Sequence, residues 1–258
     1  AARPQIAERP KGLFDGAQGT FEDAWRTLLH DGFLPETQYA AQGVAAAAAR
    51  ERVRARIVMP EDSPAVKLEN TRALGAEIIT YDRYTDDREQ ISYDLAKRDG
   101  GVIVPSYDDP LVIAGQGTAG HEIFHDAATQ GIELDALLVC CGGGGLSAGC
   151  ALAAEAMSPK TQVYCVEPEY YDDHARSLAS GQREQADVSV RSICDALLSP
   201  SPGSLTFPIN QRLLAGGLVV SEDEVREAMR FAFRVLKLVV EPGGAVALAA
   251  LLAGKLPA

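Results

Sequence analysis

The sequence lacks any long hydrophobic run and any excess of basic residues. Its 258 residues include 24 Lys and Arg against 36 Asp and Glu, which gives a formal net charge of −12. This charge repels nucleic acid and anionic lipid, so we expect neither as a partner. The apolar stretches are short and rich in alanine, far below the roughly 20 residues that a membrane span requires. Residues 1–12 contain no apolar core, so no secretory signal is expected there.

Cysteine is also scarce, and none of the five cysteines falls in a Cys-x-x-Cys motif. Their number is odd, and four of the five lie in apolar or glycine-rich stretches. Both features argue against a disulfide framework. We therefore expect buried free thiols and a reducing, cytoplasmic location for Cys140, Cys141, Cys150, Cys165 and Cys194.

What the sequence does contain is a regular alternation of strand-like runs and helical periodicity. Such alternation predicts an α/β fold built on parallel sheets. Ser63-Pro64 and the box Ser221–Glu224 are typical of helix starts. Strands are predicted at 55–60, 76–81, 101–105, 136–141, 162–168 and 218–220, and helices at 67–74, 85–98, 110–128, 146–157, 221–237 and after 242. Three consecutive strand–helix units between about 40 and 113 predict a small subdomain beside a larger one.

The most specific motif is a run of four glycines, Gly142, Gly143, Gly144 and Gly145, between a buried strand and a helix. Residues without a Cβ let successive backbone N–H groups converge on an anion, and the start of a helix adds a favourable dipole. A plain tight turn would need only one or two glycines, so the run favours a phosphate-bearing ligand. It fits neither the dinucleotide motif G-x-G-x-x-G nor the P-loop.

The motif CGGGGLSAG at 141–149 resembles the phosphate-binding loop of fold-type II pyridoxal-phosphate enzymes, the threonine/serine dehydratase and serine racemase group. Further similar segments follow in family order at 41–45, 55–89, 112–123, 166–173, 192–207 and 237–255. The resemblance implies the tryptophan synthase β-like fold, with two open parallel-sheet domains and helices on both faces. It implies a large cofactor-binding domain at 1–33 and 114–258 and a small α/β domain at 34–113. It also places Gly142–Gly145 and Leu146 at the cofactor phosphate and Glu241 near the pyridine ring.

The position of Glu241 has a second interpretation, as a carboxylate stabilised by the dipole of the helix after Pro242. The two interpretations are compatible.

An acidic segment, residues 166–173, places four carboxylates directly after a predicted strand. Oxygen ligands of this kind suit Mg²⁺ or Ca²⁺. The resemblance assigns a cation to Glu167, the carbonyl of Tyr171, and Asp173; the alternative is a solvated loop that caps the next helix. His174 is expected at the surface. The segment HEIFH at 121–125 fits the zinc motif HExxH, but no third ligand is identifiable, so we expect no zinc there.

The sequence departs from the family pattern on the side where chemistry occurs. The family forms a Schiff base between the cofactor and a lysine, and the nearest candidate here is Lys11, in KGLFDGA. Thr37 falls at the position of a serine that donates or accepts a proton in the family, whereas Tyr39 replaces an asparagine that contacts the cofactor. The chemistry is therefore lost, or these regions are incomplete or altered.

The resemblance implies a dehydratase (ammonia-lyase) that converts a small β-hydroxy amino acid, such as serine, threonine or 3-hydroxyaspartate, to a keto acid and ammonia. Its cofactor would be pyridoxal 5′-phosphate, with Mg²⁺ or Ca²⁺ as a second ligand. One alternative is an amino-acid racemase that uses the same site. Another is a non-catalytic protein that binds a phosphate ligand. A homodimer is expected from the family alone.

Overall fold

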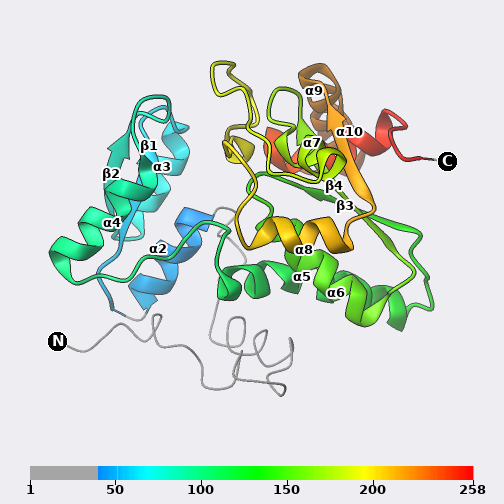
Figure 1. Ribbon diagram of the computed structural model, residues 1–258, viewed down its shortest axis with the longest axis horizontal. Helices are drawn as coiled ribbons and strands as arrows, with labels where there is room; N and C mark the ends of the chain where they lie inside the picture. Colours follow the sequence, from blue (N-terminus) through cyan, green and yellow to red (C-terminus); the bar gives the residue numbers. More distant parts are fainter. Residues whose placement is uncertain (1–39, 51, 258) are drawn as a thin grey trace. The chain divides into compact units, whose positions relative to one another are not determined.

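The computed structural model describes residues 40–50 and 52–257, and these fall into two compact units that divide between Ser106 and Tyr107. Each unit contains one parallel sheet with helices packed against it (Figure 1). The predicted α/β class with two parallel sheets is therefore confirmed. The assignment of residues 1–33 to the large domain lies outside the described residues, so the predicted domain boundaries stay a prediction.

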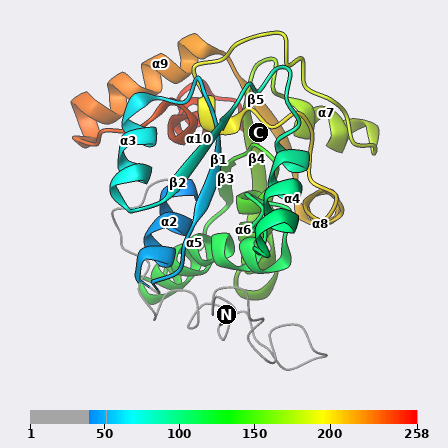
Figure 2. The ribbon, with the colours of Figure 1, turned by 90° about the vertical axis from the view of Figure 1, so that its left-hand side faces the viewer.

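The first unit is built on two parallel strands, with Arg56 opposite Glu77 and Pro60 opposite Tyr81. Its small core consists of Ala45, Ile57, Met59 and Ala76. In Figure 2, α3 and α4 flank the two strands. The elements are α2 (Ala40–Arg50), β1 (Arg56–Pro60), α3 (Ala65–Ala73), β2 (Glu77–Tyr81) and α4 (Arg88–Asp99).

Two helix starts in this unit differ slightly from the prediction. Pro64, rather than Ser63, is the N-cap of α3, and it makes no side-chain capping bond. Helix α4 begins later than expected because Asp87 caps it, accepting hydrogen bonds from the N–H groups of Glu89 and Gln90 at 2.9 and 3.0 Å. Gly100 ends α4 in the left-handed conformation, with φ at 69°.

The predicted strand at 101–105 is wrong, because this segment forms no strand in the structure. Val102, Ile103 and Val104 are 56%, 43% and 44% exposed. A strand requires a neighbour to bond its backbone N–H and C=O groups. Among the described residues this segment pairs with neither β1 nor β2. The apolar run predicted a strand from composition alone, and composition does not supply the partner.

The second unit contains three parallel strands in the order β3-β4-β5: β3 (Ala136–Cys140), β4 (Gln162–Pro168) and β5 (Gly216–Val220). Figure 1 shows β3 and β4 between α9 and α10 on one side and α5, α6 and α8 on the other. The helices are α5 (Pro110–Thr129), α6 (Gly145–Met157), α7 (Asp173–Ser180), α8 (Thr206–Leu213), α9 (Glu222–Phe231) and α10 (Pro242–Leu252), with a short 3₁₀ helix η2 (Asp195–Leu197).

One face of the three-stranded sheet is covered by α10. Val246 and Ala249 of this helix are 0% and 1% exposed, and they belong to one apolar cluster with Val166 of β4 and Val220 of β5. Complete burial of a valine contributes roughly 1.5–3 kcal/mol. This cluster holds the carboxyl ends of the central and edge strands in place.

Glycines let α5 and α6 pack closely on the opposite face. A Cβ on Gly149 of α6 would lie 2.4 Å from the carbonyl oxygen of Ile113, and one on Gly120 of α5 would lie 2.9 Å from Cα of Cys150. No real Cβ fits at such distances, so these two positions require glycine. The close contact fixes the start of α6 relative to α5.

The predicted capping box on α9 is confirmed. Ser221 Oγ accepts the N–H of Glu224 at 3.3 Å, and Glu224 Oε2 accepts the N–H of Ser221 at 2.7 Å. The helix is shorter than predicted, because a π-helical turn, η3 (Ala232–Leu236), replaces its last turns. No described helix is long and apolar enough to cross a membrane. All five cysteines are free, as predicted, and every one except the half-buried Cys140 is buried.

Candidate functional site

The loops that follow the three parallel strands meet at one edge of the sheet, since all three strands run in the same direction. The glycine loop follows β3, the acidic segment follows β4 and the capping box of α9 follows β5. Ligands of open parallel sheets bind outside this carboxyl edge. The candidate site is therefore built from loops at the carboxyl ends of the strands.

The glycine loop runs from the end of β3 into the first turn of α6. Gly144 has φ at +92° and is the N-cap of α6, which begins at Gly145. A side chain at Gly144 would be strained by this backbone conformation, and its Cβ would lie 2.4 Å from the His174 ring. The loop therefore requires glycine here for both backbone and packing reasons. Leu146 lies in the first turn of α6.

Tyr107 packs directly on the glycine loop. A Cβ on Gly143 would lie 2.3 Å from the ring carbon Cε2 of Tyr107, and one on Gly145 would lie 2.9 Å from its Cβ. Ser199 Oγ donates to the Tyr107 hydroxyl at 2.9 Å, which holds the ring in place. Part of the requirement for glycine thus comes from an aromatic ring that covers the loop.

Two loop carbonyls are held by side chains of α8. The Gly143 oxygen accepts Thr206 Oγ1 at 2.6 Å and the N–H of Gly203 at 3.1 Å. The Gly144 oxygen accepts Asn210 Nδ2 at 3.2 Å, and it also accepts hydrogen bonds from the first turn of α6. By contrast, no described residue accepts a hydrogen bond from the N–H groups of Gly143, Gly144 or Gly145.

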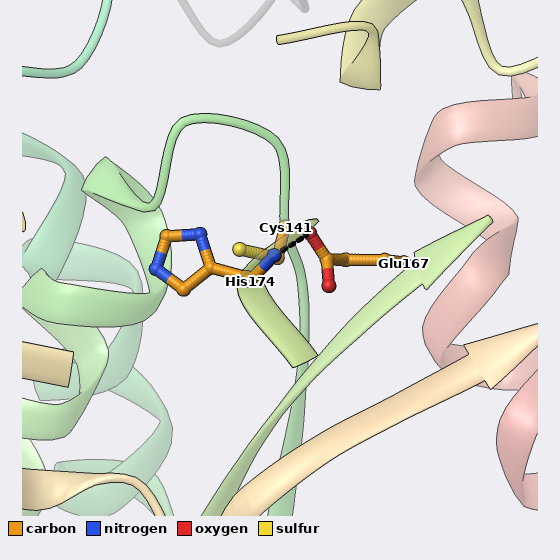
Figure 3. A group of neighbouring side chains, drawn as sticks. All are labelled: Cys141, Glu167 and His174. Atoms are coloured by element: carbon orange, nitrogen blue, oxygen red, sulfur yellow. Dashed lines mark hydrogen bonds between the residues drawn. The ribbon is translucent and has the colours of Figure 1, made fainter. Parts of the chain in front are cut away.

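Helix α7 places His174 beside the loop, and its expected surface location is wrong. His174 is 0% exposed, and its Nε2 lies 2.8 Å from Nδ2 of Asn210. The ring lies inside because α7 packs on β5 and α8 at this edge. Figure 3 shows the ring beside the Cys141 thiol, with Glu167 on the other side. Within the described residues, Cys141, Glu167 and His174 are the one group of three metal-type ligands, with ligand atoms within 4.8 Å of one another.

The three predicted cation ligands lie between the end of β4, which contains Glu167, and the first residue of α7, Asp173, and all are buried. Glu167 is 0% exposed, and its two carboxylate oxygens accept the N–H groups of His174 and Ala175 at 3.0 and 2.8 Å. Glu167 therefore caps α7, as the alternative interpretation expects, but it is buried rather than part of a solvated loop. Asp172, the N-cap residue itself, makes no side-chain capping bond.

Asp173 differs from Glu167 because its Oδ2 atom is buried and has no hydrogen-bond partner. Its burial raises the pKa of this carboxyl from 3.8 to about 7. Burial, together with the nearby Cys141 and Asp173, also raises the pKa of Glu167 well above its ordinary value. A buried carboxylate oxygen without a partner is costly, and a cation ligated there would satisfy it.

The remaining predicted residues divide between described and undescribed parts of the chain. Glu241 is the N-cap of α10, as its helix-start interpretation expects, but its side chain makes no capping bond. Lys11 and Thr37 lie outside the described residues, so their roles stay predictions. His121 and His125 stack with ring centroids 6.4 Å apart, and neither belongs to a three-ligand group in the described part of the chain.

Comparison with known proteins identifies the family. A sequence profile described as "Pyridoxal-phosphate dependent enzyme" matches residues 40–258. The chain belongs to this family. The match begins after Lys11 and Thr37, so it does not include the two residues predicted for catalysis. The family relationship accounts for a glycine loop at the carboxyl end of a parallel strand.

Individual relatives narrow the comparison. The chain is 45% identical to an L-threo-3-hydroxyaspartate ammonia-lyase from Pseudomonas sp, over 82% of this chain and 65% of the relative. It is 40% identical to a serine racemase from Schizosaccharomyces pombe, over 81% and 64%. It also superposes on the crystal structure of a threonine deaminase from T.th. with TM-score 0.76 and 43% identity, covering 84% of this chain and 69% of that one. The chain thus spans about 65% of the length of these two curated relatives.

Sequence reasoning missed Tyr107, Thr206 and Asn210. Thr206 lies in the segment 192–207, which resembles the family, but nothing local marks a threonine as a partner of a glycine 63 positions earlier. Tyr107 follows the segment that was wrongly predicted as a strand.

Proposed function

We propose that this protein is a pyridoxal-phosphate-dependent ammonia-lyase acting on a small β-hydroxy amino acid. Serine, threonine and 3-hydroxyaspartate are the substrate candidates, and the products are a keto acid and ammonia. The observation that carries the proposal is the glycine loop, which leads from β3 into α6 with its carbonyls bonded to α8. The relatives named as hydroxyaspartate ammonia-lyase and threonine deaminase support this reaction class.

The glycine loop fits the phosphate of pyridoxal 5′-phosphate. Its three N–H groups without a described acceptor and the helix N-terminus at Gly145 match the donors that a phosphate requires. We assign Gly142, Gly143, Gly144, Gly145 and Leu146 to phosphate binding. Glu241 is assigned to the neighbourhood of the pyridine ring, which is consistent with its position at the start of α10 beside the end of β3.

The bound cofactor would supply an aldehyde that links to amines and a ring that accepts electrons from the substrate α-carbon. We assign Lys11 as the amine that holds the cofactor and moves the α-proton. Thr37 would donate or accept a proton on the opposite face. Both assignments rest on the resemblance of the sequence.

We also propose a Mg²⁺ or Ca²⁺ site formed by Glu167, the Tyr171 carbonyl and Asp173. The unpartnered Oδ2 of Asp173 supports it, and hard cations prefer oxygen ligands of this kind. The cation would rigidify the start of α7, whose His174 contacts the glycine loop through Asn210. Its role would be structural.

Racemisation of serine or another amino acid is the second candidate, since serine racemases are also among the relatives. It would use the same cofactor site and a proton donor on the opposite face.

We also propose that the protein is a homodimer and that it is located in the cytoplasm. The five free cysteines support a reducing compartment. We further propose the large domain at 1–33 and 114–258 and the small domain at 34–113.

Reductive trapping tests the proposal. The protein is incubated with pyridoxal 5′-phosphate and borohydride, and the modified peptide is identified by mass spectrometry. A single adduct on Lys11 is expected. L-serine, L-threonine and L-threo-3-hydroxyaspartate are then assayed for keto acid and ammonia, and chiral chromatography measures D-amino acid. Keto acid supports the lyase, whereas D-amino acid without keto acid supports the racemase. Absence of an adduct with phosphate still bound would support a non-catalytic binding protein.

A further inference from the structure

The carbonyl oxygens of Gly143 and Gly144 are fixed by two side chains of α8 that are wholly buried. Thr206 and Asn210 are each 0% exposed. Thr206 Oγ1 donates to the Gly143 oxygen at 2.6 Å, and Asn210 Nδ2 donates to the Gly144 oxygen at 3.2 Å. A buried hydroxyl or amide without a partner is costly, so these contacts hold both side chains on the loop.

Because the peptide bond is planar, these contacts also fix the directions of the N–H groups of Gly144 and Gly145. In a trans peptide the C=O of one residue and the N–H of the next point in opposite directions. Since the Gly143 oxygen points to Thr206, the N–H of Gly144 points away from α8. The Gly144 oxygen accepts Asn210 Nδ2 at 3.2 Å together with the N–H of Ala148 at 2.9 Å and Ser147 Oγ at 3.1 Å, so the N–H of Gly145 also points away from these donors. These two N–H groups have no acceptor among the described residues.

Asp108 holds the segment that presents Thr206. Its carboxylate accepts the N–H groups of Ser204, Leu205 and Thr206 at 2.8, 2.8 and 3.2 Å, and the Ser204 hydroxyl at 2.7 Å. The N–H of Gly203 also donates to the Gly143 oxygen at 3.1 Å. The start of α8 is therefore held by Asp108, and it is bonded to the glycine loop through Gly203 and Thr206.

We infer that Thr206 and Asn210 are positioning residues for the phosphate of the cofactor. They hold two carbonyls toward α8, so that the amides of Gly144 and Gly145 face the phosphate. An unheld Gly-Gly peptide can rotate easily, because glycine has the widest backbone freedom, and a rotated peptide would present an oxygen to an anion. The inference rests on the proposed cofactor, and it assigns the selectivity for phosphate to residues outside the loop.

The test compares binding of pyridoxal 5′-phosphate with binding of pyridoxal, which lacks the phosphate, by titration calorimetry. Thr206→Val removes the hydroxyl with little change in shape, and Thr206→Ser retains it. Thr161→Val is the matched control, because it removes a buried hydroxyl that bonds the Leu134 carbonyl at 2.8 Å away from the loop. Asn210→Leu tests the second contact. Thermal melts confirm that each variant folds.

The expected result is a loss of preference for the phosphate form of about tenfold or more in Thr206→Val, which corresponds to one hydrogen bond to a charged group. Thr206→Ser should restore the preference, and Thr161→Val should keep it. Equal losses for both ligands in Thr206→Val would indicate a purely structural role and overturn the inference. If Asn210→Leu does not fold, the comparison of Thr206→Val with Thr206→Ser alone tests the inference. A wild-type protein with no phosphate preference would instead refute the proposed function.

Discussion

The side-chain amide of Asn210 lies 2.8 Å from Nε2 of His174, and both residues are completely buried. Because an amide nitrogen only donates, Nε2 accepts this bond and the proton of a neutral ring belongs on Nδ1. The same amide donates to the Gly144 carbonyl at 3.2 Å. One side chain thus connects the glycine loop to α7, which begins at the proposed cation ligand Asp173.

Alanine at Gly143 is expected to abolish cofactor binding and to destabilise the fold. Its Cβ would lie 2.3 Å from the Tyr107 ring, and overpacking of this kind costs about 1–3 kcal/mol. Gly131→Ala is the control: Gly131 has φ at +69°, but no atom lies within 4 Å of the added Cβ. That variant should lose about 1–2 kcal/mol of stability through backbone strain alone, and it should still bind pyridoxal 5′-phosphate. Urea unfolding and titration with pyridoxal 5′-phosphate measure both effects; unchanged affinity in Gly143→Ala would refute the phosphate assignment.

Removal of the Asp173 charge is expected to eliminate stabilisation by divalent cations. Mg²⁺ or Ca²⁺ at 100 times its dissociation constant should stabilise the wild-type protein by about 2.7 kcal/mol. The stabilisation is expected because the unpartnered Oδ2 of Asp173 would bind the cation. Thermal melts with the cation and with EDTA measure the shift. Asp173→Asn should show no shift, whereas Asp172→Asn, which changes the adjacent carboxylate paired with Arg176, should keep it. Equal shifts in both variants would exclude Asp173 as a ligand.

Asp108 should make stability depend on pH in the acid range. Burial raises its pKa, but the bonds from the Ser204 hydroxyl and the N–H groups of residues 204–206 outweigh burial and hold the pKa below its ordinary value. A depressed folded-state pKa stabilises the protein above the unfolded pKa of about 3.9 and loses this effect as the pH falls through the folded value.

The comparison of wild type with Asp108→Asn isolates this contribution. The stability difference between them should be largest at neutral pH and should shrink as the pH falls below about 4. Urea unfolding across this range measures it. Asp223→Asn, which removes an exposed carboxylate of α9, is the control. A constant difference between wild type and Asp108→Asn at every pH would contradict the prediction.

The cysteines should resist alkylation in the native protein. Burial raises the pKa of Cys150 to about 11 and that of Cys194 to about 12, and the thiolate is the reactive form. Iodoacetamide should modify neither thiol at neutral pH over the time in which it modifies all five cysteines in urea. Peptide mass spectrometry measures the extent at each site. Rapid modification of Cys194 in the native protein would show that this part of the core opens readily.

Local signals were sufficient for most of the elements. The alternation of apolar strands and helices predicted the parallel sheets, and Ser221–Glu224 predicted the start of α9, because each signal depends on neighbouring residues. The segment 101–105 failed since a strand depends on its partner as well as its composition. The end of α9 was also mispredicted, because no local sequence signal marks the π-helical turn at η3.

The sequence by itself determined that four glycines lie between a buried strand and a helix, and it predicted a backbone anion site there. Only the tertiary structure decided which way the amides of that loop face. Thr206 and Asn210 lie 63 and 66 positions from the glycines that they contact, and His174 is buried only because α7 packs on this edge. A glycine peptide has no side chain to fix its own orientation, so distant residues must fix it.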